Sequence, residues 1–145
     1  MGGDGGAGGA PQLASELFGT WDLVSIEAAG MSMNCPGVIE LNATEEVSCP
    51  TGATTFNSDG TFVEIETTDE FGNPSSFWSE GTWSTQGSTL TLTFTQEGPD
   101  ENNLQPVDPP ETESAMWSVA GTTLTISVTS PIAPFVEIKG TLEKR

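Results

Sequence analysis

The residues of this sequence that could do acid–base chemistry are almost all carboxylates. The chain holds 21 Asp and Glu, 3 Lys and Arg, and no histidine. The absence of histidine excludes the Ser-His-Asp and Cys-His arrangements of nucleophilic catalysis. A pair of carboxylates can still act as general acid and base, and Glu64, Glu66 and Glu80 lie in strand-like segments. Because their parity is opposite to that of the apolar residues, we expect them on a solvated outer face. We therefore predict no catalytic residue and no enzymatic activity.

The two cysteines, Cys35 and Cys49, are the other candidates for chemistry. Neither belongs to a C-x-x-C pair and the chain has no histidine, so a zinc site is not expected. The oxygen-rich residues 57–61 lack the later glutamate of a calcium loop and are explained by a tight turn. We predict no metal and no cofactor. Two free thiols and one disulfide are both open, and we favour a Cys35–Cys49 disulfide because the chain has features of an exported protein.

The net charge of −18 restricts the partners of the protein. All three cations lie near the end of the sequence, at Lys139, Lys144 and Arg145. Such a surface repels phosphate backbones and anionic lipid head groups, so we expect no nucleic-acid partner and no binding to membrane surfaces. Two explanations of the acidity stay open, solubility and adaptation to high salt, and the scarcity of lysine favours the second.

The strands that would position these residues are indicated by alternation. After a turn at Gln86-Gly87, residues 89–95 alternate strictly between threonine and the apolar Leu90, Leu92 and Phe94, which is typical of a half-buried antiparallel strand. A similar Trp-Ser…Gly…Thr-Leu-Thr pattern recurs over residues 117–126. Asp59-Gly60 indicates another hairpin. About eight strands with short connections predict an all-β fold, an eight-stranded antiparallel up-and-down β-barrel, with a two-sheet sandwich as the alternative.

The remaining segments divide the chain into a tether and one domain. Residues 1–13 are a flexible Gly-rich tether, and residues 14–145 form the barrel domain, in which residues 14–18 make a helical turn that plugs one end. Residues 29–52 form an irregular excursion held by the disulfide. Residues 96–113 are expected to be a long, acidic, proline-rich loop, and loops of this length are usually functional or disordered.

Parity also predicts the interior of the barrel. Trp78 is expected outside. The set expected to face inward lacks charge and comprises Leu23, Val63, Ile65, Phe77, Trp83, Leu90, Leu92, Phe94, Trp117, Val119, Leu124, Ile126, Val128, Val136, Ile138 and Leu142. If the barrel is open at one end, the residues predicted to bind an apolar ligand are Trp83, Trp117, Phe77, Leu92, Phe94 and Ile126.

Three segments together resemble a known family. Leu17 to Ser25 with its Gly19-Thr20-Trp21, Thr55 to Phe62 with its Asp59-Gly60, and Gly81-Thr82-Trp83-Ser84 are similar to the bacterial lipocalin-like domains, found mostly in exported lipoproteins. The resemblance covers about residues 14–143. It implies an eight-stranded barrel that the first Trp closes at one end, export, and binding of an apolar small molecule. The chain departs from typical lipocalins in its acidity, in residues 96–113 and in having no recognisable C-terminal helix.

Two functions therefore stand as expectations. The first is a monomeric carrier of an apolar small molecule, exported to the periplasm or cell surface of a bacterium. Its only membrane attachment would be a lipid on a cysteine preceding residue 1. The second is a non-enzymatic structural or interaction module, with a filled barrel and the acidic loop of residues 96–113 as its recognition element.

Overall fold

The chain folds into a closed antiparallel β-barrel. The computed structural model describes residues 12–145 apart from 29, 41–42, 45, 50, 71–72 and 130–136. A 3₁₀ helix (Ser15–Leu17) precedes the strands, which are β1 (Gly19–Ala28), β2 (Met31–Asn34), β3 (Gly37–Glu40), β4 (Glu46–Cys49), β5 (Thr51–Phe56), β6 (Thr61–Glu70), β7 (Asn73–Gln86), β8 (Thr89–Gly98), β9 (Gln105–Ala120), β10 (Thr123–Thr129) and β11 (Glu137–Lys144).

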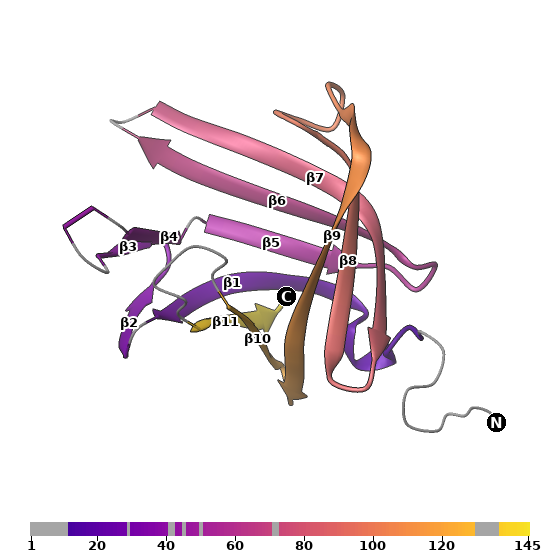
Figure 1. The fold of residues 1–145 in the computed structure, drawn as a ribbon, viewed down its shortest axis with the longest axis horizontal. Helices are drawn as coiled ribbons and strands as arrows, with labels where there is room; N and C mark the ends of the chain where they lie inside the picture. Colours follow the sequence, from indigo (N-terminus) through magenta and orange to yellow (C-terminus); the bar gives the residue numbers. More distant parts are fainter. Residues whose placement is uncertain are drawn as a thin grey trace.

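Eight of these strands form the barrel wall. Strands β5 to β11 pair with their sequence neighbours, β1 pairs with β5, and β11 returns to pair with β1 (Figure 1). The predicted up-and-down barrel is confirmed, and the sandwich is not observed. Strand β2 extends the edge of β1, and β3 and β4 form a separate hairpin.

The tight turns gather at one end of the barrel. The β5–β6, β7–β8 and β9–β10 turns each contain a glycine with positive φ, at Gly60 (92°), Gly87 (61°) and Gly121 (62°). In the first of them, the Asp59 carboxylate accepts hydrogen bonds from the Thr61 amide at 2.9 Å and the Thr61 hydroxyl at 2.7 Å. The predicted hairpins at residues 59–60 and 86–87 are therefore confirmed, with the turn chemistry that the sequence indicated.

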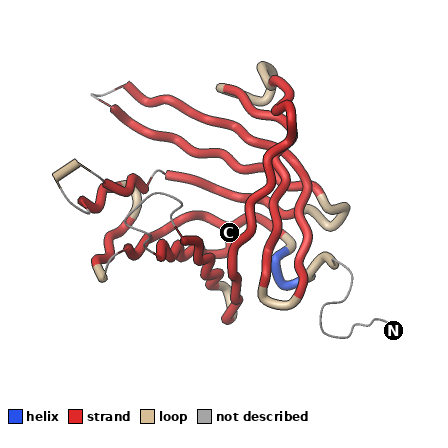
Figure 2. Tube along the Cα trace, viewed as in Figure 1, coloured by secondary structure: helices blue, strands red, loops and turns tan. Residues whose placement is uncertain are grey.

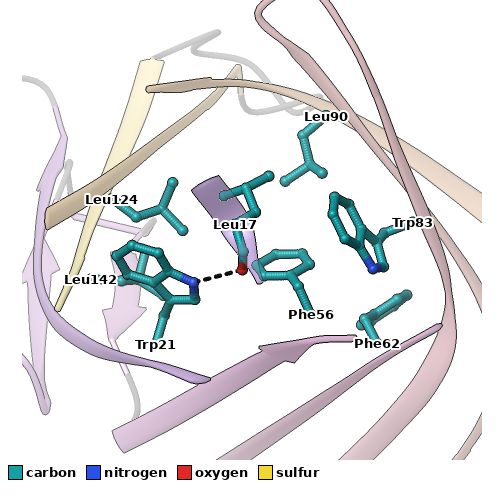
Figure 3. Packing of buried hydrophobic residues seen from close by; sticks show 8 residues of the cluster. All are labelled: Leu17, Trp21, Phe56, Phe62, Trp83, Leu90, Leu124 and Leu142. Atoms are coloured by element: carbon teal, nitrogen blue, oxygen red, sulfur yellow. Dashed lines mark hydrogen bonds between the residues drawn. The ribbon is translucent and has the colours of Figure 1, made fainter. Parts of the chain in front are cut away.

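This end of the barrel is plugged. The 3₁₀ helix lies beside the ends of the strands (Figure 2), and it buries Leu17 completely. The Trp21 indole, also fully buried, donates a hydrogen bond to the Leu17 carbonyl oxygen at 2.9 Å (Figure 3). The core around them comprises Phe56, Phe62, Trp83, Leu90, Leu124 and Leu142. A helical turn at this end was predicted, and the structure confirms it.

The opposite end of the barrel is less regular because β1 changes partners. Strand β1 pairs with β5 only from Gly19 to Asp22, and from Ser25 onward its edge is taken by β2. A register shift between Leu23 and Ser25 accompanies the change. Strands β1 and β5 therefore part above the plug, while β11 stays paired with β1 as far as Ala28.

The prediction of a long loop over residues 96–113 is wrong. Strand β8 continues to Gly98 and β9 begins at Gln105, so only residues 99–104 connect them. Strand β10 pairs with β9 only from Met116 to Ala120, which leaves the earlier part of β9 with β8 as its single partner. Proline is tolerated on such an edge because its missing N–H is not needed by a second strand. The three prolines of this segment therefore fit within a strand.

The excursion of residues 29–52 is partly ordered by β2 and by the β3–β4 hairpin, in which Gly37 is opposite Cys49. Cys35 is disulfide-bonded, and the described residues include no free cysteine. The side chain of Cys49 lies outside the described residues, as does Val136 of the predicted interior. The Cys35–Cys49 pairing stays a prediction.

Candidate functional site

Strand β6 turns its acidic side chains toward the barrel interior. Phe62 is fully buried in the core, so residues of the same parity, Glu64 and Glu66, face inward. The prediction that these two glutamates lie on the outer face is wrong, and so is the prediction that Val63 and Ile65 face inward. Glu80 on β7 is on the outer face, as expected, where it accepts a hydrogen bond from the Trp78 indole at 3.0 Å.

A cavity of about 220 Å³ lies above the plug. Five adjacent strands form its wall, and β1 and β5 are the two that part from each other at this level. Its lining residues are mostly apolar and include one carboxyl pair: Leu23, Gly52, Ala53, Thr54, Glu64, Glu66, Ile126, Val128, Ile138, Gly140 and Leu142.

Glycine makes room for this cavity. Gly140 is opposite Ile126 on β10 and Ile26 on β1, at the inward-facing level where its neighbours carry large side chains. A Cβ atom added to Gly140 would lie 3.6 Å from the Leu23 Cδ1 atom, an ordinary van der Waals contact. The backbone at Gly140 therefore does not require glycine. Glycine inside a strand often marks a place where a ligand approaches closely.

The carboxyl pair has unusual acid–base properties. Desolvation, the negative charges of Glu66 and Glu113, and a hydrogen bond with Glu66 raise the pKa of Glu64 to about 7, although a hydrogen bond with Thr54 opposes the shift. Desolvation and the charge of Glu113 also raise the pKa of Glu66, while its hydrogen bond with Glu64 lowers it. Burial and mutual negative charge therefore make both carboxyls harder to ionise than an exposed glutamate.

Hydroxyl groups flank the pair on both sides. Thr54 on β5 and Ser79 on β7 are each directly opposite Glu64 in the strand register. They are 8% and 4% exposed. Ser79 is on the inward face of β7, because it is directly opposite Glu64, while Thr54 lines the cavity itself. This wall can therefore accept several hydrogen bonds from one guest molecule.

The residues predicted to bind a ligand are mostly not at the cavity. Of the six, Ile126 lines it. Trp83 is buried in the plugged core, and its indole donates to the Asn57 carbonyl oxygen at 3.0 Å. The other three that pack against that core are Leu92, Phe94 and Trp117. Phe77 is directly opposite Glu66 and so lies on the inward face, but it is 46% exposed and does not line the cavity.

Comparison with known proteins agrees with the geometry. A family described as the lipocalin-like domain matches residues 17–108, more than half of the chain. The chain belongs to the lipocalin-like domain family. No curated protein and no solved structure matches it. The barrel of this lipocalin-like domain and its plug at Trp21 fit the family resemblance seen in the sequence.

Sequence reasoning missed the carboxyl pair of this lipocalin-like domain, although a signal was present. The Asp59-Gly60 turn fixes the β5–β6 register and sets Phe56 opposite Phe62. Two large aromatic residues on one face are a stronger hydrophobic signal than Val63 and Ile65 on the other face. They indicate which face of β6 points inward. Extending the parity from Phe62 would have placed the glutamates inside.

Two further features of this lipocalin-like domain concern metals and membranes. Within the part of the chain that the structure describes, acidic and cysteine side chains nowhere gather in threes as a metal ion would require. The same described residues contain no helix with the length and hydrophobicity to span a bilayer.

Proposed function

We propose that this lipocalin-like domain is a non-enzymatic binding protein that holds a small, largely apolar molecule in the cavity above its plug. The observation that supports the proposal is the cavity of about 220 Å³, with aliphatic side chains from β1, β10 and β11 on one wall. Pockets for drug-sized ligands measure about 300–1,000 Å³, so the guest is smaller than these. Burial of its apolar surface would contribute roughly 25 cal/mol per Å².

The structure changes one part of the sequence-based expectation. The interior that strand parity predicts lacks charge. Glu64 and Glu66 overturn this expectation, because both line the cavity. A guest must either leave these groups solvated or offer them a polar partner, since burial without a partner is costly.

Export to an oxidising compartment, as a lipid-anchored bacterial protein, is part of the same proposal. The bonded state of Cys35 supports it, because disulfides persist mainly outside the cytosol. Because lysine and arginine are scarce, carboxylates dominate the charged residues, and this supports a solvated outer surface. We propose that the protein is a monomer.

A pair of valine variants on β11 tests the binding proposal. Gly140→Val adds a side chain inside the cavity, where a Cβ atom meets no close obstacle. Thr141→Val adds apolar surface at the next residue, on the outer face. We expect neutral probes such as hexan-1-ol and cyclohexanol to shift the amide NMR signals of Gly52 and Gly140 in wild type. Thr141→Val should behave like wild type, and Gly140→Val should bind at least tenfold more weakly.

Two results would contradict the proposal. The first is that no probe shifts the signals of cavity residues at millimolar concentration. The second is that Gly140→Val, shown to be folded by its dispersed spectrum, binds the probes as well as Thr141→Val does. Either result would favour the structural or interaction module.

A further inference from the structure

The two walls of the cavity differ in chemistry. Leu23, Ile126, Val128 and Ile138 form an aliphatic wall on β1, β10 and β11. The other wall, on β5 and β6, carries the carboxyls of Glu64 and Glu66. A molecule that satisfies both walls needs an apolar body and a polar head at one end.

The chemistry of the polar wall determines which head fits. A carboxylate accepts hydrogen bonds and attracts cations, and the hydroxyl of Thr54 can accept as well. An anionic head would be repelled by the partly buried pair. A neutral head would leave the negative charge of the pair uncompensated. An ammonium group carries three donors and one positive charge, so it matches two carboxyls and a hydroxyl.

We infer that the cavity is a site for a small primary amine with an apolar body, whose ammonium group binds between Glu64 and Glu66 and whose body lies against the β1, β10 and β11 wall. This inference rests on the proposed function and names the class of its ligand. The Thr54 hydroxyl, which lines the cavity directly opposite Glu64, is the third acceptor for the head group.

The amine replaces a proton in this site. Below about pH 7, Glu64 is protonated in the free protein, because burial and neighbouring negative charges raise its pKa to about 7. The charged groups that face Glu64 are Glu66 on its own strand and Glu113 from β9. The cavity-lining residues of β1, β5, β10 and β11 include no ionisable side chain. A bound ammonium group stabilises ionised Glu64, so the proton leaves for solvent as the amine enters.

The test compares three probes that share one body. Hexylamine, hexan-1-ol and hexanoate are titrated into the protein at pH 7.5 in 0.5 M NaCl, which screens the general attraction of cations to a chain of net charge −18. Binding is measured by calorimetry and by shifts of the Gly52 and Gly140 amide signals. We expect hexylamine to bind roughly tenfold or more tightly than hexan-1-ol, the size expected of a charge-assisted hydrogen bond, and hexanoate to bind most weakly.

Matched glutamine variants assign the effect to the cavity. Glu64→Gln removes one negative charge inside the barrel, while Glu80→Gln removes one on the outer face and keeps an acceptor for the Trp78 indole. We expect Glu64→Gln to abolish the preference for hexylamine and Glu80→Gln to leave it intact. Hexylamine affinity of wild type should also rise between pH 6 and pH 7.5, and that rise should disappear in Glu64→Gln.

The outcomes separate this inference from the proposed function. If hexan-1-ol binds as tightly as hexylamine, the amine inference is wrong while the binding function stands. If Glu64→Gln and Glu80→Gln weaken hexylamine equally, the attraction is general to the acidic surface and the inference is again overturned. If none of the three probes shifts the cavity signals, both the inference and the proposed function fail.

Discussion

At the scale of single residues, the central feature is a carboxyl pair that the barrel holds partly out of water. Glu64 lies opposite Thr54 and Ser79, and it is hydrogen-bonded to the Glu66 carboxyl on the same face. The two carboxyl groups repel each other's negative charge when no ligand is bound. Desolvation adds to the free-energy cost of ionising them. Binding sites often keep such locally unfavourable groups, because a ligand that supplies the missing charge gains most from them.

This cost predicts that Glu64→Gln stabilises the protein at high pH. The pKa of Glu64 is raised from 4.5 to about 7 on folding. A raised pKa means that the folded state binds more protons, so the stabilising contribution is complete below pH 4.5 and is lost as the pH rises through 7. The variant should therefore gain up to about 3 kcal/mol over wild type at pH 8. It should gain little at pH 4.

Urea denaturation of both proteins at these two pH values measures the difference. Glu80→Gln serves as the control, and its effect on stability should be small and similar at both pH values. If Glu64→Gln shows an equal stability difference at pH 4 and pH 8, Glu64 is not a desolvated group.

At the scale of elements, the local sequence predicts the hairpins well and the orientation of some strands poorly. Asp59-Gly60 and Gln86-Gly87 determine turns by the φ angles that they permit, so these turns were predictable. Strand β6 was not assigned correctly because both of its faces carry apolar residues. The orientation of β6 depends on which of its residues pack in the core at the plugged end. Phe62 packs there, so the face that carries Phe62 points inward. The prolines of β9 locally indicate a loop, and the short pairing with β10 that lets them fit in a strand is a tertiary feature.

The cavity illustrates the limit of prediction most clearly. The only predicted ligand-contacting residue found there is Ile126. A cavity is set by where side chains are missing, here at Gly52 and Gly140, and by the level at which β1 leaves β5. Neither feature follows from alternation within one strand.

A close approach between strands predicts a sensitive position at Gly81. A Cβ atom there would overlap the carbonyl oxygen of Thr93 and crowd the Phe62 ring. The backbone cannot yield easily at this point, because Gly81 is opposite Phe94 beside a register shift. We expect Gly81→Ala to cost at least about 3 kcal/mol of folding free energy, at the upper end of overpacking effects.

Gly140→Ala is the matched comparison, because its Cβ atom has only ordinary contacts. Its free energy of unfolding should be within about 1 kcal/mol of wild type. Chemical denaturation measures both, and equal costs for the two alanine variants would contradict the close approach seen at Gly81.

The excursion between β1 and β5 predicts a disulfide-dependent stability. Closing a loop of about 15 residues contributes roughly 3 kcal/mol by restricting the unfolded chain. We expect intact-mass analysis without reductant to show no alkylated Cys35 or Cys49, and reduction to lower the unfolding free energy by a similar amount. Rapid alkylation of both thiols in the native, unreduced protein would rule the bridge out.

At the scale of the whole molecule, uncompensated negative charge is the main electrostatic feature. Among the described residues there are two ion pairs, Arg145 with Asp22 at 2.6 Å and Lys139 with Glu137 at 4.0 Å. Carboxylates crowded on a small surface repel one another and oppose the compact state.

Salt should therefore stabilise the fold. The Debye length falls from about 10 Å at 0.1 M to about 3 Å at 1 M, which screens repulsion between neighbouring surface charges. We expect the Tm, followed by circular dichroism at pH 7, to rise with NaCl over this range. A flat or falling curve would show that repulsion does not limit stability, and the acidity would then be explained by solubility.

The inward position of Glu64, facing a desolvated cavity, is tested most directly by carboxyl-detected NMR titration. The side-chain carboxyl signal of Glu64 should titrate with a pKa of about 7 in the free protein. Saturating hexylamine should move that midpoint to lower pH, since the ammonium group stabilises the ionised form. A midpoint near the ordinary value of 4.5, unchanged by the amine, would contradict both the inward orientation of strand β6 and the function built on it.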